Sequence, residues 1–155
     1  MRRKDRQRDA AFALEVLRRA PFATLSLVTP QGGAYGIPVS PAVTEAGVLY
    51  FHCALQGEKL DCIRAHPQVC VSAVSQMRLL PEDYSVAYDS AVVTGTARLV
   101  EDPWEKREAL RLICQRYAPQ NTEDFEPTLA RWLDRTCIVG ITPEHITGKQ
   151  HLKSE

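Results

Sequence analysis

The sequence lacks an excess of either charge, a long apolar run and a leader of the secretory kind. Its 19 basic and 19 acidic residues cancel, so no overall field draws the chain to nucleic acid or to an anionic membrane. No apolar segment is long enough to span a bilayer, and the charged N-terminus lacks the apolar core of a signal peptide. These absences predict a cytoplasmic protein with no nucleic-acid partner and no membrane partner.

Paired cysteines are also missing. The chain has five cysteines, an odd number, and none lies in a C-x-x-C motif: Cys53, Cys62, Cys70, Cys114 and Cys137. This spacing argues against a disulfide framework and against a structural zinc site, so we expect no metal. Their apolar neighbours favour buried, unreactive thiols.

The composition of the 155 residues is that of a folded chain, with 45% hydrophobic and 25% charged residues. We therefore expect one domain over residues 1–155. Alternating apolar residues predict strands at 22–29, 34–40, 47–53, 69–77, 90–100 and 136–141. Helical periodicity predicts helices at 5–20, 58–66, 102–117 and 127–135. This order, in which the strands do not alternate with helices one by one, favours a small α+β barrel with an antiparallel sheet.

Four details within these elements carry further expectations. Pro38 cannot donate to a sheet ladder, so its strand should lie at an edge, a bulge or an opening. Gly95 interrupts a strand and indicates a bulge or a close backbone approach. Asp102 and Pro103 fit the start of a helix, and we expect Trp104 on its apolar side. Residues 78–88 show no clear pattern, and the tail at 146–150 fits either an ordered or a frayed segment.

The candidate functional stretch runs from residue 50 to residue 67. There a strand ends, Gly57 makes a turn, and a helix begins with Glu58 and Lys59. A cation in the first turn of a helix opposes the helix dipole, whereas a bound phosphate would suit both the ammonium and the free backbone N–H groups. The alternative is an exposed lysine that costs a few tenths of a kcal/mol, roughly the surface value of such a clash.

His52 is the candidate catalytic residue. It ends the strand before the Gly57 turn, which is the candidate anion site and is called the anion turn below. Histidine titrates near neutral pH, which suits a catalytic role. A structural role is the alternative. Cys53 cannot form a nucleophile–base pair with His52, because neighbouring side chains of a strand point to opposite faces. The chain also has no G-x-G-x-x-G, P-loop, H-E-x-x-H or G-x-S-x-G motif. An anion site without a catalytic set indicates chemistry supplied by a cofactor.

Several segments together resemble a known family. They are the start MRRKDR, the strand YGIPVS, the stretch YFHCALQGEKLDCIRAHPQVCVSAV, the strand YDSAVVTGTARLVED and the end ITGK. The sequence is similar here to the flavin-binding split-barrel proteins related to pyridoxamine 5′-phosphate oxidase. Within them it most resembles the 5-nitroimidazole resistance, or nitroimidazole reductase-like, subfamily. The F-H-x-A-x-x-G-x-K spacing is the most specific part, and it includes Ala54.

The resemblance implies an α+β fold with a six-stranded antiparallel Greek-key split β-barrel and peripheral helices. It also implies a homodimer with FMN at the interface. The residues implied at the cofactor come from four segments. Gly57 and Lys59 would hold the phosphate, and His52 and Ala54 belong to the same motif. The other implied cofactor contacts are Ile37, Pro38, Val39, Ser40, Ser90, Val92 and, reaching the partner subunit's cofactor, Lys149 and Gln150.

Two departures from the family pattern bear on function. Glu58 stands where many relatives have a basic residue, which removes a phosphate ligand. The chain also lacks the arginine-containing C-terminal motif that holds the substrate of true pyridoxamine phosphate oxidases. We therefore expect an FMN-dependent oxidoreductase acting on a small flat electron acceptor, with nitroaromatics as candidates and NAD(P)H as a candidate reductant. The alternative is a non-catalytic flavin carrier or sensor, and vitamin B6 oxidation ranks below both.

Overall fold

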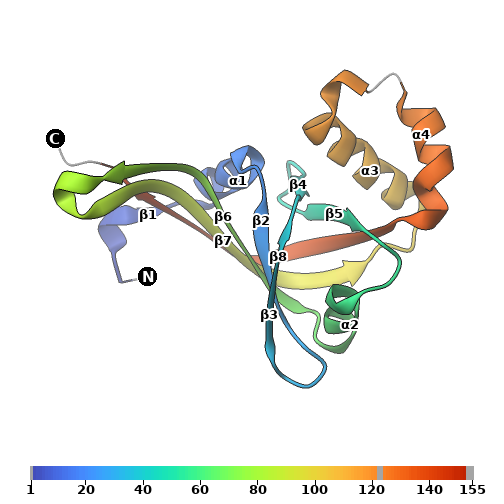
Figure 1. Ribbon diagram of the computed structural model, residues 1–155, viewed down its shortest axis with the longest axis horizontal. Coiled ribbons are helices and arrows are strands. Elements are labelled where there is room, and N and C mark those ends of the chain that lie inside the picture. Colours follow the sequence, from blue (N-terminus) through green and yellow to red (C-terminus); the bar gives the residue numbers. More distant parts are fainter. Residues whose placement is uncertain (1, 122–123, 153–155) are drawn as a thin grey trace.

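The computed structural model describes residues 2–121 and 124–152, which form an α+β fold built on one antiparallel sheet (Figure 1). The strands are β1 (Gln7–Arg8), β2 (Ala23–Val28), β3 (Ala34–Val39), β4 (Ala42–Val43), β5 (Leu49–Cys53), β6 (Gln68–Leu80), β7 (Ser85–Leu99) and β8 (Cys137–His151). The α-helices in the described residues are α1 (Ala10–Arg19), α2 (Glu58–Ala65), α3 (Pro103–Tyr117) and α4 (Phe125–Trp132). No helix in this described part is both long and apolar enough to cross a membrane.

The sheet is strongly curled, and its two edge strands come close together without pairing. Its strand order is β3-β2-β6-β7-β8-β5-β4, with β1 pairing to β8. The two ends of this path, β3 and β4, are separated along the chain only by Ser40 and Pro41. The sheet must therefore curl until its two edges come close together, and because β3 and β4 do not pair with each other, the barrel is split along this line. The predicted count of six strands is not confirmed, because the sheet has eight; β1 and β4 contain only two residues each.

Alternation of apolar residues places the core inside the curl. The burial of β2 alternates strictly, with Leu25 and Leu27 inside, and Val71 of β6 and Val93 of β7 are also fully buried. Helix α1 covers the core with Ala13, Val16 and Leu17. It begins at Ala10, not at residue 5 as the sequence predicted, because the Asp9 carboxylate accepts a hydrogen bond from the Phe12 N–H and caps it.

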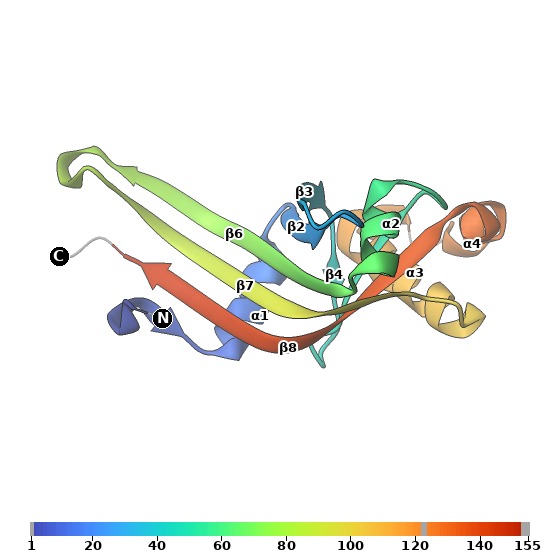
Figure 2. The same ribbon diagram turned by 90° about the horizontal axis from the view of Figure 1, so that it is seen from below.

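Three long strands extend from the barrel as a ribbon. β6, β7 and β8 are longer than the sequence predicted, and Figure 2 shows them running out beyond α1. The unassigned residues 78–88 complete the β6–β7 hairpin around a 3₁₀ turn at Pro81–Asp83. The tail at 146–150 is ordered as part of β8. The outer face of this ribbon exposes apolar side chains at Val74 (49%), Met77 (63%), Leu79 (64%) and Val92 (41%).

Helix α3 lies over the outer face of β5 and β8. The Asp102 carboxylate accepts from the Glu105 N–H, and Pro103 is the first residue, as predicted. Ala109 and Ile113 are buried against Ile138, in a second, smaller core. Trp104, predicted on the apolar side, is instead 71% exposed, and the residue of this turn that contacts the barrel is Glu105, which bonds Tyr50 and Arg98.

Gly95 occupies the bulge that the sequence predicted. The β7–β8 register shifts between Thr94 and Gly95, and a Cβ at Gly95 would lie 2.1 Å from the backbone oxygen of Thr142. No Cβ fits at that distance unless the two strands separate.

We therefore expect Gly95→Ala to lower the free energy of unfolding by roughly 1–3 kcal/mol, the usual cost of overpacking a core. Denaturant unfolding followed by circular dichroism measures it. Gly36→Ala is the matched control, because its Cβ would meet nothing nearer than the Thr24 Cγ2 at 3.9 Å. Equal stability of the two variants would contradict the close approach at Gly95.

Candidate functional site

The turn before α2 has the geometry of an anion site. Gly57 has φ 143°, a left-handed conformation that side chains rarely adopt, and it stands at the N-cap of α2. Its carbonyl accepts from the N–H groups of Leu60 and Asp61. No side chain among the described residues caps this helix, so the N–H groups of its first residues stay available to a ligand.

The Lys59 ammonium is available at the same place. Lys59 is half-buried, and its ammonium has no hydrogen bond or ion pair among the described residues. It lies close enough to Cys53 to lower the pKa of that thiol, although burial dominates and raises it to about 11. Lys59 therefore faces back toward the end of β5. Glu58 beside it is exposed to solvent.

His52 and Ala54 stand between this turn and a cavity. The cavity has a volume of about 810 Å³ and lies between the end of β5 and the helices α3 and α4. His52 is opposite Ile138 of β8, on the face of the sheet that α3 covers, and both His52 and Ala54 line the cavity. The His52 imidazole has no hydrogen-bond partner among the described residues, so nothing there fixes its tautomer.

The cysteines are only partly as predicted. All five are free, but only Cys62 and Cys137 are buried, while Cys53, Cys70 and Cys114 are half-buried. Burial raises the pKa of the Cys53, Cys62 and Cys70 thiols. These three thiols are therefore protonated near neutral pH, which makes them weak nucleophiles. Cys53 faces Cys137 across β5 and β8.

β3, the strand that contains Pro38, is an edge strand, which is one of the alternatives that the sequence predicted. β3 pairs only with β2, and Pro38 lies opposite Thr24. Val39 is buried, Ile37 is half-buried, and Pro38 and Ser40 are exposed. The other edge of β3 has no strand partner in the described residues, so its backbone groups are open to a ligand or a partner chain.

The remaining predicted cofactor residues lie elsewhere on the chain. Ser90 and Lys149 face each other on β7 and β8, where the Ser90 hydroxyl donates to the Lys149 carbonyl (3.3 Å). At about 3.3 Å per residue, the stretch of β8 from Ile138, beside His52, to Lys149 spans on the order of 30 Å. One chain therefore does not bring Ser90, Val92, Lys149 and Gln150 to the anion turn.

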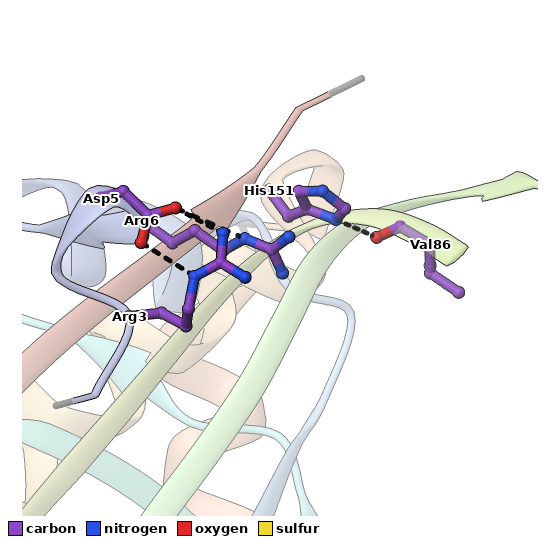
Figure 3. A network of polar contacts seen from close by, with 5 residues as sticks. All are labelled: Arg3, Asp5, Arg6, Val86 and His151. Atoms are coloured by element: carbon purple, nitrogen blue, oxygen red, sulfur yellow. Dashed lines mark hydrogen bonds and ion pairs between the residues drawn. The ribbon is translucent and has the colours of Figure 1, made fainter. Parts of the chain in front are cut away.

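Lys149 and Gln150 belong to a polar cluster at the end of the ribbon. The Lys149 ammonium lies 5.4 Å from the centre of the Tyr88 ring, and Lys149 and Arg6 lower the pKa of the Tyr88 hydroxyl. The Gln150 amide donates to Asp89 (2.8 Å) and accepts from the Arg8 guanidinium (2.7 and 2.9 Å). Figure 3 shows the neighbouring part of this cluster, where Arg3 pairs with Asp5 and His151 donates to the Val86 carbonyl.

Sequence reasoning missed the cavity. Its walls are residues of α3 and α4, which the periodicity identifies only as apolar helix faces. Arg135 and Thr136, which line the end near His52, follow α4 without any motif around them. Only the packing of α3 over β5 reveals that these segments meet.

Comparison with known proteins gives a family match. The family model described as pyridoxamine 5′-phosphate oxidase matches residues 9–150 of the chain. This match confirms the family that the sequence motifs predicted. No curated protein matches the chain.

Solved structures share the fold at low sequence identity. A protein from Bacteroides thetaiotaomicron described as a putative 5-nitroimidazole antibiotic resistance protein is 20% identical, with a TM-score of 0.73 over 91% of this chain and 83% of that one. The flavocytochrome Anf3 from Azotobacter vinelandii is 18% identical, with a TM-score of 0.82 over 99% and 72%. An FAD and heme binding protein from Mycobacterium smegmatis is 20% identical, with a TM-score of 0.80 over 96% and 74%.

Proposed function

The chain belongs to the pyridoxamine 5′-phosphate oxidase family, and from that premise we propose that it is an FMN-dependent oxidoreductase acting on a small flat electron acceptor. The observation that carries the proposal is the uncapped start of α2 beside the unpaired Lys59 ammonium. Both features suit a phosphate monoester, because the backbone N–H groups and the ammonium converge on one anion. A protein of similar fold is described as binding FAD and heme, which supports a flavin, and FMN is proposed here because it carries a phosphate monoester.

The chain's own residues would hold and orient the cofactor. FMN supplies a two-electron carrier when it is bound. Gly57 and Lys59 hold its phosphate, and the open edge of β3 from Ile37 to Ser40 offers backbone groups to its ring. His52, at the mouth of the cavity, holds the proton that a reduced acceptor takes up.

The electron acceptor would meet the flavin at His52. A flat nitroaromatic fits this description, and NAD(P)H is the proposed reductant. Pyridoxamine 5′-phosphate is a poor candidate, because the arginine-containing motif that grips it in true oxidases is missing. We therefore expect no release of hydrogen peroxide when pyridoxamine 5′-phosphate is offered as the substrate.

We expect Lys59→Ala to weaken FMN binding by about 1.5–3 kcal/mol, roughly ten- to a hundredfold, the range for a hydrogen bond to a charged group. Titration of the purified protein with FMN, followed by flavin fluorescence and by the visible spectrum, measures it. FAD titrated in parallel shows which flavin is preferred.

Arg64→Ala is the matched control, since Arg64 lies on α2 but pairs with Asp61 in solvent. Glu58→Lys should strengthen binding, because it removes a negative charge beside the phosphate. Unchanged affinity in Lys59→Ala would remove Lys59 from the site, and a wild-type protein that stays colourless with FMN would overturn the proposed function.

His52→Ala should affect turnover far more than binding. We expect FMN affinity within about threefold of wild type and acceptor reduction lower by on the order of a hundredfold, because general acids contribute at least that much. Stopped-flow reoxidation of the reduced flavin by a nitroaromatic measures the rate. His66→Ala, at an exposed position just after α2, is the control. Equal loss of binding and turnover would indicate a structural role for His52.

A homodimer would complete the site. The predicted cofactor residues of β7 and β8 lie far from the anion turn in one chain, and the outer face of the ribbon exposes Val74, Met77 and Val92. If this face meets a second copy, Ser90, Val92 and Lys149 can reach the cofactor of the partner. Gln150 points to the opposite face of the ribbon, where it bonds Asp89 and Arg8. Burial of these apolar side chains would also supply the stabilising free energy of the interface.

Val92→Glu should therefore give a monomer with weakened FMN binding, because a carboxylate would be buried at the interface. Sedimentation velocity and the FMN titration measure the two effects. Val28→Glu is the control, since Val28 is similarly exposed (38% against 41%) but lies on β2. A dimeric Val92→Glu variant would contradict this interface, and a monomer with intact FMN affinity would contradict a shared site.

A non-catalytic flavin carrier or sensor is the second candidate. The observation that favours it is the lack of a hydrogen-bond partner for His52 among the described residues, because catalytic histidines are usually oriented by a second group. Reduction of the bound flavin by NAD(P)H, with turnover of an acceptor, distinguishes the two.

A further inference from the structure

One wall of the cavity behind His52 is helix α3, which is attached to the barrel at both ends. Helix α3 is fixed to the barrel near its start, where the Tyr50 hydroxyl donates to Glu105 (2.6 Å) and Arg98 pairs with the same carboxylate. Near its end, the Tyr117 hydroxyl donates to the Pro41 carbonyl (2.9 Å) and Arg116 donates to the Ala20 carbonyl (2.6 Å). These contacts hold both ends of α3 against the barrel.

Helix α4 is held to α3 by polar contacts. Glu126 pairs with Arg107 (2.5 Å) and Arg111 (3.2 Å), and the Arg111 guanidinium stacks over the Phe125 ring at 4.8 Å. Lys106 donates to the Leu133 carbonyl (2.5 Å). These contacts fix the hairpin of α3 and α4 while leaving its apolar side chains directed at the cavity.

The cavity is apolar in its interior and cationic at one end. Leu110, Ile113, Phe125, Leu129 and Trp132 supply apolar walls, and the volume of about 810 Å³ lies within the range of small-molecule sites. Arg135 and His52 line the end next to the β5 terminus. The Arg135 guanidinium has no carboxylate partner among the described residues, while Asp124, which also lines the cavity, lies at the opposite end of α4.

We propose that this cavity binds a small planar aromatic molecule that carries one anionic group. The anion lies against Arg135 and His52, because a guanidinium without a partner beside an imidazole suits an oxyanion. The ring lies among Ile113, Phe125 and Leu129, where it gains dispersion contacts with apolar side chains on several sides. This deepens the proposed function, on which it rests, by assigning an aromatic acid as the electron acceptor, with His52 shared by the flavin and acceptor sites.

The two tryptophans of the chain allow ligand binding in the cavity to be followed by fluorescence. Trp132 lines the cavity, whereas Trp104 is exposed on the first turn of α3, away from it. Trp104→Phe therefore leaves a reporter in the cavity, and Trp132→Phe leaves one outside. The probe is 4-nitrobenzoate, a contact quencher of indole fluorescence, and 4-nitrotoluene is its neutral analogue of similar shape. The titration is made without flavin, so it does not depend on FMN binding.

We expect saturable quenching by 4-nitrobenzoate in Trp104→Phe and only linear, collisional quenching in Trp132→Phe. Arg135→Met in the Trp104→Phe background should weaken 4-nitrobenzoate roughly tenfold or more and leave 4-nitrotoluene unchanged. Arg131→Met is the control, because Arg131 is exposed on α4 and does not line the cavity.

Linear quenching in both tryptophan variants would overturn the site. Saturation with equal affinity for the two probes, or no effect of Arg135→Met, would overturn the anionic class of ligand. Saturable binding in a protein that takes no FMN would leave the cavity assignment standing while refuting the flavin proposal.

Discussion

Ser40 and Pro41 separate the strand at one edge of the sheet from the strand at the other edge. Because β3 and β4 are joined so closely, the sheet between them must bend until its two edges lie close together. The short link of Ser40 and Pro41 also determines which segments lie beside the candidate site. The end of β5 emerges beside it, and the Tyr117 hydroxyl fixes the end of α3 to the Pro41 carbonyl. Barrel closure therefore positions the anion turn, the open edge of β3 and the cavity wall relative to one another.

Local signals predicted the elements well wherever the determining contact is local. The Asp102 cap, the Gly57 turn and the Gly95 bulge each depend on backbone geometry within a few residues or one strand away. The edge position of β3 followed from Pro38 alone, because a missing N–H excludes a central strand. The family motifs then predicted the barrel as a whole.

The errors arise where distant segments decide the outcome. Residues 78–88 have no strong alternation of their own, yet they pair across the β6–β7 hairpin because the ribbon continues around them. Trp104 looks like a core residue by its position in the helical pattern, but its side chain is exposed, and Glu105 contacts the barrel from the same turn instead. The cavity and Arg135 depend on how α3 and α4 dock, and no spacing in the sequence encodes that docking. Likewise, the separation of Lys59 from Lys149 follows from strand register, which motif matching does not measure.

The hairpin of α3 and α4 is attached to the barrel chiefly by side chains, among them Tyr50, Arg116 and Tyr117, and not by a strand ladder. The anion turn belongs to a different segment, between β5 and α2. Substitutions that reshape the hairpin can therefore accumulate over evolutionary time without disturbing the turn at Gly57 or the pairing of the sheet. Such a division allows one scaffold to keep its barrel and this turn unchanged while the cavity walls of its descendants diverge.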